Sequence, residues 1–308
     1  MIFDLGSVLI VRREVTTMNI GVNDSLKSDT GVGDDLQRKL TALESYISQW
    51  PRVIVAFSGG VDSSLVLRTA IEALGTENVL AVTVVSPLMP QRDQGTAAMV
   101  AAGMGARRRI VETDELQEEA IAANPPNRCF YCKSNTFGLL TAIAREEGYR
   151  AVLDGTNRSD CSDYRPGMAA IRGFDTVHSP LLECGLDKQE VRRLARQLGL
   201  PNWNLPAQAC LASRIPYGVP LTLDKLEQIA RAEAVLAEFG LDNVRVRHHG
   251  QIARIEVAPE ELEKVLKTEL LQEISRRIKA CGFTYAALDL DGYRTGSLNE
   301  VLASTDRQ

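Results

Sequence analysis

The chain has 308 residues, of which 44% are apolar and 24% charged, and it carries a formal net charge of −5. A globular chain of this size has room for two domains, and its acidic balance argues against a surface dominated by contacts with nucleic-acid phosphates. No run approaches the ~18 apolar residues of a membrane span, and the N-terminus lacks the features of a signal peptide. Six cysteines are too few for a disulfide scaffold, so we expect reduced thiols in the cytoplasm.

Residues 1–35 are predicted to be a disordered N-terminal extension, because residues 15–35 contain few large apolar side chains. A domain then begins with an amphipathic helix, whose apolar residues recur at helical spacing. They are Leu36, Leu40, Leu43 and Ile47. Further apolar runs predict strands at residues 53–57, 79–85, 107–112 and 151–154, separated by helices at 91–104 and 133–147. Alternating strands and helices are typical of a parallel α/β sheet.

The first predicted strand leads into the sequence SGGVDSS, residues 58–64, and then into a predicted helix. In an open α/β sheet such a loop lies at the carboxyl end of a strand, where backbone N–H groups meet anionic ligands. The loop has no G-K-[ST] sequence, so it lacks the lysine of Walker A loops. An ordinary glycine turn is the alternative. We predict a phosphate-binding loop of another type, formed by Ser58, Gly59, Gly60, Asp62, Ser63 and Ser64.

Three cysteines form a second pattern. Cys129 and Cys132 make a C-x-x-C pair in a predicted loop, and Cys210 lies in PAQACLASRIPYG. This pattern indicates metal or redox chemistry, and the flanking Arg128 and Lys133 favour thiolates. Three buried thiols are the alternative.

A zinc site would need a fourth ligand, for which Cys161 is the one plausible residue. Three thiolates would instead leave one iron of a [4Fe–4S] cluster without a protein ligand, open to exogenous sulfide. Cys184 and Cys281 are assigned to packing.

Arginines alternate with valines in VRVR, which predicts a strand with Arg245 and Arg247 on one face. The sequence HHGQ then predicts a hairpin turn into the strand IARIEV. Two neighbouring arginines suit a phosphate or a carboxylate pair, and a solvated strand face is the alternative. In LDKQEVRRLARQLGL, residues 186–200, the charges are assigned to the solvated face of a helix.

SGGVDSS resembles the pyrophosphate loop of the PP-loop ATPases, and DGTNRSD, residues 154–160, resembles the second loop of that superfamily. The resemblance implies that ATP is cleaved between its α- and β-phosphates, so that an oxygen of the substrate is adenylated. A nucleophile then displaces AMP. The fixed dipoles of the loop would stabilise the departing pyrophosphate, with Mg²⁺ positioned by Asp62.

The sequence ACLASRIPYG around Cys210 resembles the LarE family of sulfur transferases, as do RPGMAAIRG upstream and VRVRHHGQIARIEV and DLDGYRTGSLNE downstream. The resemblance runs from about Leu36 to Leu302. It implies that ATP adenylates the carboxylates of pyridinium-3,5-biscarboxylic acid mononucleotide and that each becomes a thiocarboxylate. Some members sacrifice the sulfur of the cysteine that matches Cys210. Others hold a [4Fe–4S] cluster with three cysteines, which Cys129, Cys132 and Cys210 match.

The implied architecture is α/β, with a PP-loop parallel-sheet domain over residues 36–220 and a smaller C-terminal α+β domain over residues 221–308. The implied substrate-binding residues are Arg214, Glu233, Arg245, Arg247, Gly155, Thr156, Asn157 and Asp160. The expected partners are the mononucleotide, a sulfide donor and further copies of the chain, without nucleic acid or membrane.

Rival functions stay open on the sequence. A tRNA thiolase of the same superfamily also joins a PP-loop to cluster cysteines, but it needs a basic RNA-binding surface that an acidic chain with few aromatic residues does not indicate. A non-catalytic adenine-nucleotide-binding module would bind ATP and release no pyrophosphate. An amidotransferase-type synthetase uses ammonia and has no need of the three cysteines.

Overall fold

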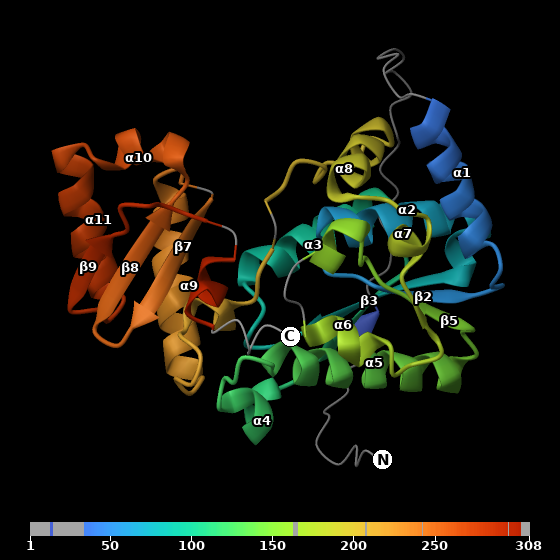
Figure 1. Ribbon diagram of the computed structural model, residues 1–308, viewed down its shortest axis with the longest axis horizontal. Coiled ribbons are helices and arrows are strands. Elements are labelled where there is room, and N and C mark those ends of the chain that lie inside the picture. The colour runs from blue at the N-terminus through green and yellow to red at the C-terminus, as the bar shows by residue number, and fades with distance from the viewer. Residues whose placement is uncertain are drawn as a thin grey trace. The chain divides into compact units, whose positions relative to one another are not determined.

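The computed structural model describes residues 13–14, 34–162, 166–206, 208–241, 243–294 and 296–302 (Figure 1). The chain divides into two compact units. The first takes the residues up to Ser86, Arg92–Asp114 and Cys129–Gln208, and the second takes Pro87–Gln91, Glu115–Arg128 and the residues from Ala209 onward. The second unit therefore includes two segments from the N-terminal half, whereas the predicted second domain begins at residue 221. No helix in these ranges is both long and apolar enough to cross a membrane.

Helix α1 (Asp34–Ile47) opens the first unit, and its four apolar residues at helical spacing are all buried. This confirms the helix predicted from Leu36. Two acidic residues lie in its first turn, where the partial positive charge of a helix N-terminus favours them. Residues 1–12 and 15–33, which make up most of the predicted extension, lie outside the described residues.

The sheet of the first unit has the strand order β1-β4-β3-β2-β5-β6. Strands β2 to β6 run parallel to their neighbours, and β1 pairs antiparallel with β4. The bounds are β1 (Arg13–Glu14), β2 (Val53–Ala56), β3 (Val79–Val85), β4 (Arg108–Glu112), β5 (Ala151–Leu153) and β6 (Val177–His178). The parallel sheet confirms the predicted fold class, although the two-residue strand β6 was not predicted.

The direction of winding reverses at the centre of this sheet. The chain passes from β2 to β3 and β4 on one side, and then returns to β5 and β6 on the other side of β2. The reversal lies between β2 and β5, where Val53 pairs with Ala151. Open α/β sheets bind ligands at such a switch point, outside the carboxyl ends of the strands. The loops that follow β2 and β5 are SGGVDSS and DGTN, so the topology brings the two predicted loops to one place.

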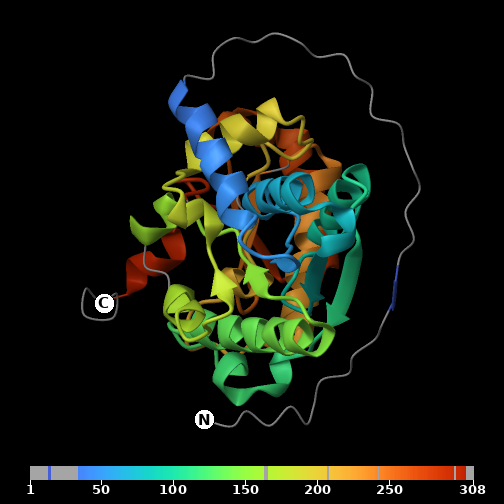
Figure 2. The same ribbon diagram turned by 90° about the vertical axis from the view of Figure 1, so that its right-hand side faces the viewer.

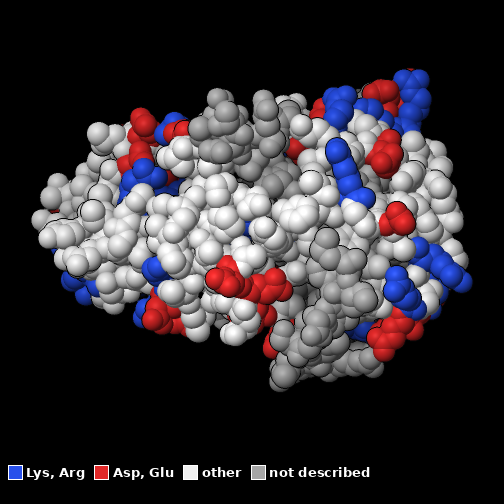
Figure 3. Space-filling view, turned by 60° about the horizontal axis from the view of Figure 1, so that its bottom comes forward, with Lys and Arg blue, Asp and Glu red and all other residues white. Residues whose placement is uncertain are grey.

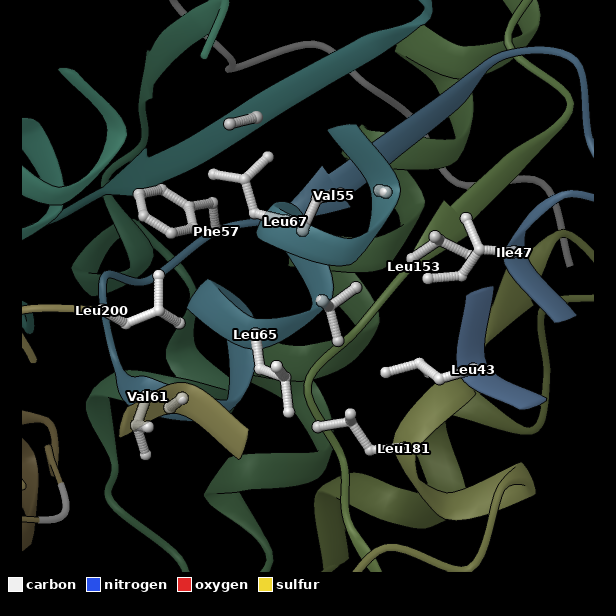
Figure 4. Close-up of a cluster of buried hydrophobic side chains, with 14 of the residues drawn as sticks. Leu43, Ile47, Val55, Phe57, Val61, Leu65, Leu67, Leu153, Leu181 and Leu200 are labelled. Carbon is white, nitrogen blue, oxygen red and sulfur yellow. The ribbon is translucent and has the colours of Figure 1, made fainter. Parts of the chain in front are cut away.

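Helices cover both faces of the sheet, and Figures 1 and 2 show α1 and α2 on one face and α5 on the other. The bounds are α2 (Val61–Leu74), α3 (Gln91–Gly103), α5 (Arg128–Glu147), α6 (Pro166–Ile171), α7 (Pro180–Glu183) and α8 (Lys188–Gln197). Successive residues of β2 face opposite layers, because side chains alternate along a strand. Val53 and Val55 join the apolar cluster of α1, α2 and α8, whereas Ile54 joins that of α5. Figure 4 shows side chains of the first cluster, among them Ile47 and Leu153.

The second unit is built around a three-stranded sheet of order β7-β8-β9, which is antiparallel between β7 and β8 and parallel between β8 and β9. The bounds are α4 (Glu119–Ala122), α9 (Leu223–Glu238), β7 (Val244–His249), β8 (Ile252–Val257), α10 (Pro259–Val265), α11 (Thr268–Ala280) and β9 (Tyr285–Leu288). The turn between β7 and β8 confirms the predicted hairpin, and Gly250 has the positive φ of 64° that this turn needs. Helices α9 and α11 pack apolar residues on the sheet.

Candidate active site

The loop of residues 58–64 lies between β2 and α2, where the sequence placed it. Its own polar groups fix its shape. The N–H of Gly60 donates to Ser58 Oγ at 3.3 Å, and Ser63 Oγ donates to the carbonyl of Gly60 at 3.1 Å. Gly60 is the N-cap of α2, and no side chain caps this helix end. The first N–H groups of α2 can therefore bind an anion, which the helix dipole also favours.

The backbone conformation at residue 59 and the close approach of α3 both require a glycine. Its φ is +80°, and a Cβ added there would lie 2.6 Å from the Cα of Ala97 in α3. We predict that Gly59→Ala lowers the free energy of unfolding by about 1–3 kcal/mol and weakens ATP binding, because the loop must shift to accommodate the methyl group. Thermal unfolding and ATP titration measure the two effects.

The matched control for that variant is Gly95→Ala. A Cβ added at Gly95, which lies inside α3, meets no heavy atom within 4 Å. This substitution should raise the stability by about 0.4–1 kcal/mol, since it lowers the entropy of the unfolded chain without strain. A Gly59→Ala protein as stable as the Gly95→Ala protein would show that the loop tolerates a side chain.

The loop after β5 approaches the phosphate-type loop closely. A Cβ on Gly155 would lie 2.8 Å from the backbone nitrogen of Ser63, so only glycine lets the two backbones come this near. The buried Asn157 donates from Nδ2 to Asp62 Oδ1 at 3.1 Å. Asp160 in turn accepts a hydrogen bond from the N–H of Asn157 at 3.0 Å. The two predicted loops thus form one polar site at the switch point.

Asp62 has a further partner that was not predicted from the sequence. Lys188, the first residue of α8, donates from Nζ to Asp62 Oδ2. Their side chains are only 30% and 22% exposed, so the assignment of this lysine to a solvated helix face was wrong. One signal was available in the sequence. The dipole disfavours a cation in the first turn of a helix, so a lysine there indicates a compensating carboxylate.

Asn202 also contacts the loop and was not predicted. Its Nδ2 donates to the carbonyl of Gly59 and to Ser64 Oγ, both at 2.8 Å, and the side chain is buried. It therefore fixes the backbone of the loop at Gly59 and the hydroxyl of Ser64. No local pattern in the sequence marks this residue, because an Asn after a proline is also a common turn residue.

The C-x-x-C pair lies on a helix rather than in the predicted loop. Helix α5 begins at Arg128, so Cys129 is its second residue and Cys132 its fifth, and the two, three residues apart, lie on the same side of it. The prediction of a loop was wrong because the helix begins at Arg128, only two residues after Pro126, so the loop that contains the two prolines stops before the cysteines. A helix N-terminus stabilises anionic sulfur.

Cys210 lies in the second unit, at the N-cap of a 3₁₀ turn formed by Leu211–Arg214. Its carbonyl accepts hydrogen bonds from Ser213 Oγ at 2.8 Å and from Arg214 Nη1 at 3.1 Å. The buried guanidinium of Arg128 lies beside it, with Nη2 4.0 Å from Sγ. Arg128 precedes Cys129 in the sequence, yet its charge lies next to Cys210.

Arg128 is held in place by Asn124, whose Oδ1 accepts from Nη1 of the guanidinium. Asn124 has a positive φ of 55°, and its Nδ2 donates to the carbonyls of Pro216 and Val219 at 2.9 and 3.1 Å. An asparagine in the left-handed region persists only where such contacts fix it. These contacts fix the guanidinium beside the sulfur.

All six cysteines are thiols rather than disulfides. Cys281 is buried in the core of the second unit and Cys184 packs against the core of the first, which confirms their assignment to packing. Burial raises the pKa of the Cys281 thiol, and burial together with Glu183 raises that of Cys184. Both are therefore poor nucleophiles. Across the described ranges, no group of three or more His, Cys, Asp and Glu side chains is arranged to hold a metal ion.

The predicted substrate arginines are buried in the second unit. Arg214 pairs with Glu233, with Nε–Oε1 at 2.9 Å, and Arg247 pairs with Glu256, with Nη2–Oε2 at 2.8 Å. Arg245 is 2% exposed and lies over the ring of Tyr293, at 4.8 Å from its centroid. The alternative of a solvated strand face is therefore wrong.

These ion pairs connect the sheet to the Cys210 segment. Arg247 Nη1 donates to the carbonyl of Ser213 at 2.6 Å, and Arg214 bonds the carbonyl of Cys210 as described above. Burial alone would raise the pKa of Glu233, but the charges and hydrogen bonds of Arg214, with a contribution from Arg245, outweigh it and lower that pKa. Glu233 is thus a carboxylate that fixes Arg214.

A strand, an SGGVDSS loop without a Walker lysine and a helix at the switch point of a parallel sheet define the PP-loop class of nucleotide-binding proteins. Residues 36–135 match the family model described as NAD synthase. Over 267 residues, 87% of this chain, the sequence is 41% identical to an uncharacterized protein of Synechocystis sp., of which it covers 99%. Over the same share it is 39% identical to the pyridinium-3,5-bisthiocarboxylic acid mononucleotide synthase of Lactiplantibacillus plantarum, of which it covers 96%.

The chain therefore belongs to the LarE family of PP-loop sulfur transferases. This confirms the predicted family and the predicted enzyme class, an ATP-dependent sulfurtransferase. A tRNA-specific 2-thiouridylase of Chlorobium luteolum is 31% identical over 179 residues, which are only 48% of this chain and 48% of that enzyme. The similarity to the thiouridylase thus covers a part of the chain, whereas the LarE similarity covers most of it.

Proposed function

We propose that this enzyme adenylates the carboxylates of pyridinium-3,5-biscarboxylic acid mononucleotide and converts them to thiocarboxylates. The observation that carries the proposal is the contact between the SGGVDSS and DGTN loops at the switch point. The chain matches a synthase of this product over 87% of its own length and 96% of the length of that synthase. A carboxylate is a poor electrophile because its leaving group would be oxide. Adenylation replaces that group by AMP.

The loop residues supply the electrostatics of this step. The substrate oxygen attacks the α-phosphate, and the N–H groups at the start of α2 stabilise the departing pyrophosphate. Ser58, at the start of the loop, adds a hydroxyl donor. Asp62 fits Mg²⁺, because it offers a partly exposed carboxylate in the first turn of α2, beside the phosphate site. Asp62 would hold the magnesium ion, whose positive charge would neutralise the pyrophosphate oxygens.

We propose that Cys129, Cys132 and Cys210 are ligands of a [4Fe–4S] cluster. The donor set fits, since two thiols lie on one side of a helix N-terminus and the third has a buried guanidinium beside its sulfur. The cluster would supply an iron that can bind exogenous sulfide, so that the protein loses no sulfur in turnover. The role of this chain is to provide three thiolates and cationic surroundings for anionic sulfur.

Gly155, Thr156, Asn157 and Asp160, together with Arg214, Glu233, Arg245 and Arg247, are proposed to bind the mononucleotide. We predict that Arg245→Ala or Arg247→Ala weakens the binding of the mononucleotide about ten- to a hundredfold, the value of a charge-assisted hydrogen bond of ~1.5–3 kcal/mol. ATP affinity should stay unchanged. Calorimetric titration with each ligand measures both affinities.

The buried contacts of these arginines require a control. Arg254→Ala removes a half-exposed arginine that also bonds Glu256, at 3.1 Å, and it should leave the affinity for the mononucleotide unchanged. If Arg245→Ala and Arg247→Ala lose ATP and keep the mononucleotide, the arginines serve another subsite. If they lose only thermal stability, they are structural.

The proposed adenylation is tested by separating the nucleotides after incubation of the protein with ATP, Mg²⁺ and pyridinium-3,5-biscarboxylic acid mononucleotide. AMP and pyrophosphate should appear in equal amounts, and only when the mononucleotide is present. ADP and orthophosphate as the main products would contradict the proposal. A protein that binds ATP and releases no pyrophosphate under any condition would be a binding module.

RNA is not proposed as a substrate. On the face shown in Figure 3, Lys and Arg side chains lie scattered among Asp and Glu side chains, without a continuous basic area. Backbone contacts to RNA would need such an area. The sulfide donor, assembly into a homo-oligomer and the cytoplasmic location stay predictions.

A further inference from the structure

Lys188 stands out in the phosphate site, because it reaches the site from a distant part of the chain. It opens helix α8, whose N-cap Asp187 accepts from two backbone N–H groups and forms a capping box with Glu190. The cap fixes the first turn, so the lysine starts from a rigid position. In that turn the helix dipole opposes a cation. The ion pair with Asp62 offsets this opposition.

The contact places a cation at the beginning of α2. Asp62 is the second residue of α2, and the N–H groups that would receive phosphate oxygens belong to the same turn. An ammonium has three N–H donors, and among the described residues the Lys188 Nζ donates to Asp62 alone. With the side chain 30% exposed, donors remain for a ligand that enters this loop.

The loop itself contains no lysine, unlike Walker A loops, in which a lysine reaches the terminal phosphates. A departing pyrophosphate nevertheless needs neutralisation, since catalysis of phosphate chemistry is largely electrostatic. Asp62 cannot supply it, because a carboxylate repels phosphate oxygens unless a metal ion lies between them. A cation is therefore expected from another element, and Lys188 lies at the required position.

We propose that Lys188 is a ligand of the pyrophosphate group of ATP and of the released product. In the free enzyme Asp62 neutralises its ammonium and keeps it at the loop. With a nucleotide bound, the ammonium donates to the β- or γ-phosphate oxygens, and the carboxylate of Asp62 would be available to hold a magnesium ion. As the carboxylate oxygen of the substrate bonds to the α-phosphorus, the bond from that phosphorus to the bridging oxygen breaks with both electrons on pyrophosphate, and Lys188 stabilises this charge. The proposal depends on ATP cleavage between the α- and β-phosphates and not on the identity of the carboxylate substrate.

Lys188→Met tests the proposal, because methionine keeps the length of the side chain without the charge. Pyrophosphate should bind about ten- to a hundredfold more weakly, and the rate of AMP formation at saturating ATP should fall about 10²- to 10³-fold. Lys188→Arg keeps a cation and should retain pyrophosphate binding within roughly tenfold of the unmodified protein. Titration with magnesium pyrophosphate reads the binding without any carboxylate substrate.

Lys39→Met is the matched control. Lys39 also forms an ion pair with the first turn of α8, with Nζ 2.6 Å from Glu190 Oε1, and it does not contact the loop. If Lys188 were merely structural, both variants would lose thermal stability alike and both would bind pyrophosphate normally, which would overturn the proposal. Unchanged pyrophosphate binding in Lys188→Met overturns it as well. If the unmodified protein forms ADP, the proposed adenylation fails, and the binding comparison still decides the role of Lys188.

Discussion

Cys210→Ser should abolish sulfur transfer while ATP is still cleaved. If the three cysteines hold a cluster, loss of any one leaves too few ligands, so Cys129→Ser and Cys132→Ser should give the same result together with loss of the brown chromophore. The local fold should survive in Cys210→Ser, because Ser213 and Arg214 bond the carbonyl of Cys210 and not its sulfur. Anaerobic visible spectra, iron and sulfide analysis and the yield of thiocarboxylate measure the outcome.

Cys184→Ser serves as the control for these variants, since Cys184 packs against the core of the first unit and has no proposed chemical role. It should keep both the chromophore and sulfur transfer. The rival route sacrifices the sulfur of Cys210 and leaves dehydroalanine, a loss of the elements of hydrogen sulfide that mass spectrometry detects. Stoichiometric dehydroalanine at Cys210, with Cys129→Ser still active, would overturn the cluster and leave the sulfur transfer standing.

Asp62→Asn is expected to lower the rate of adenylation about 10²- to 10³-fold, while the affinity for ATP changes much less. Asparagine has nearly the same shape, so Asn157 can still donate to its oxygen. The substitution removes the negative charge that we propose to hold Mg²⁺ on the departing pyrophosphate, and this charge would matter most in the transition state. Steady-state rates at several magnesium concentrations, with ATP affinity measured by titration, separate the two effects.

Asp224→Asn is the matched control, because Asp224 is an exposed aspartate at the second position of α9, as Asp62 is at the second position of α2. Both substitutions remove one negative charge from a helix N-terminus, but only Asp62 belongs to the SGGVDSS loop that we propose to bind phosphate. Asp224→Asn should turn over like the unmodified protein. Equal rates in Asp62→Asn would remove this carboxylate from the chemistry.

Local patterns were sufficient to predict the first helix and the central strands of the parallel sheet, but not every element of the fold. The helical spacing of the apolar residues from Leu36 to Ile47 and the apolar run of β2 are patterns of residues that are close in the sequence. Such patterns indicate the local structure directly, so the helix and the strand were predicted correctly. The start of α5 was missed because two prolines favour a loop before a helix as much as its first turn. The tertiary structure determines where α5 begins, and the residues around the prolines do not indicate this start by themselves.

The site was predictable only where its residues are consecutive. SGGVDSS carries its chemistry in a single loop, whereas Lys188 and Asn202 meet it through the packing of α8 and the segment that follows. The burial of Arg247 likewise depends on Glu256, the residue that the β-hairpin brings within 2.8 Å. Charge patterns along one strand cannot distinguish such a buried pair from a solvated face. Contacts across the fold supply the missing information.

The claim that this enzyme transfers sulfur to the carboxylates of the pyridinium mononucleotide is tested most directly by the mass of that mononucleotide after the reaction. The protein, reconstituted without oxygen, is incubated with ATP, Mg²⁺, sulfide and pyridinium-3,5-biscarboxylic acid mononucleotide, and the mononucleotide is then weighed by mass spectrometry. Our account predicts that its carboxylates exchange oxygen for sulfur, with one AMP and one pyrophosphate released for each exchange. A mononucleotide of unchanged mass after AMP has been released, or sulfur incorporation without ATP, would contradict it.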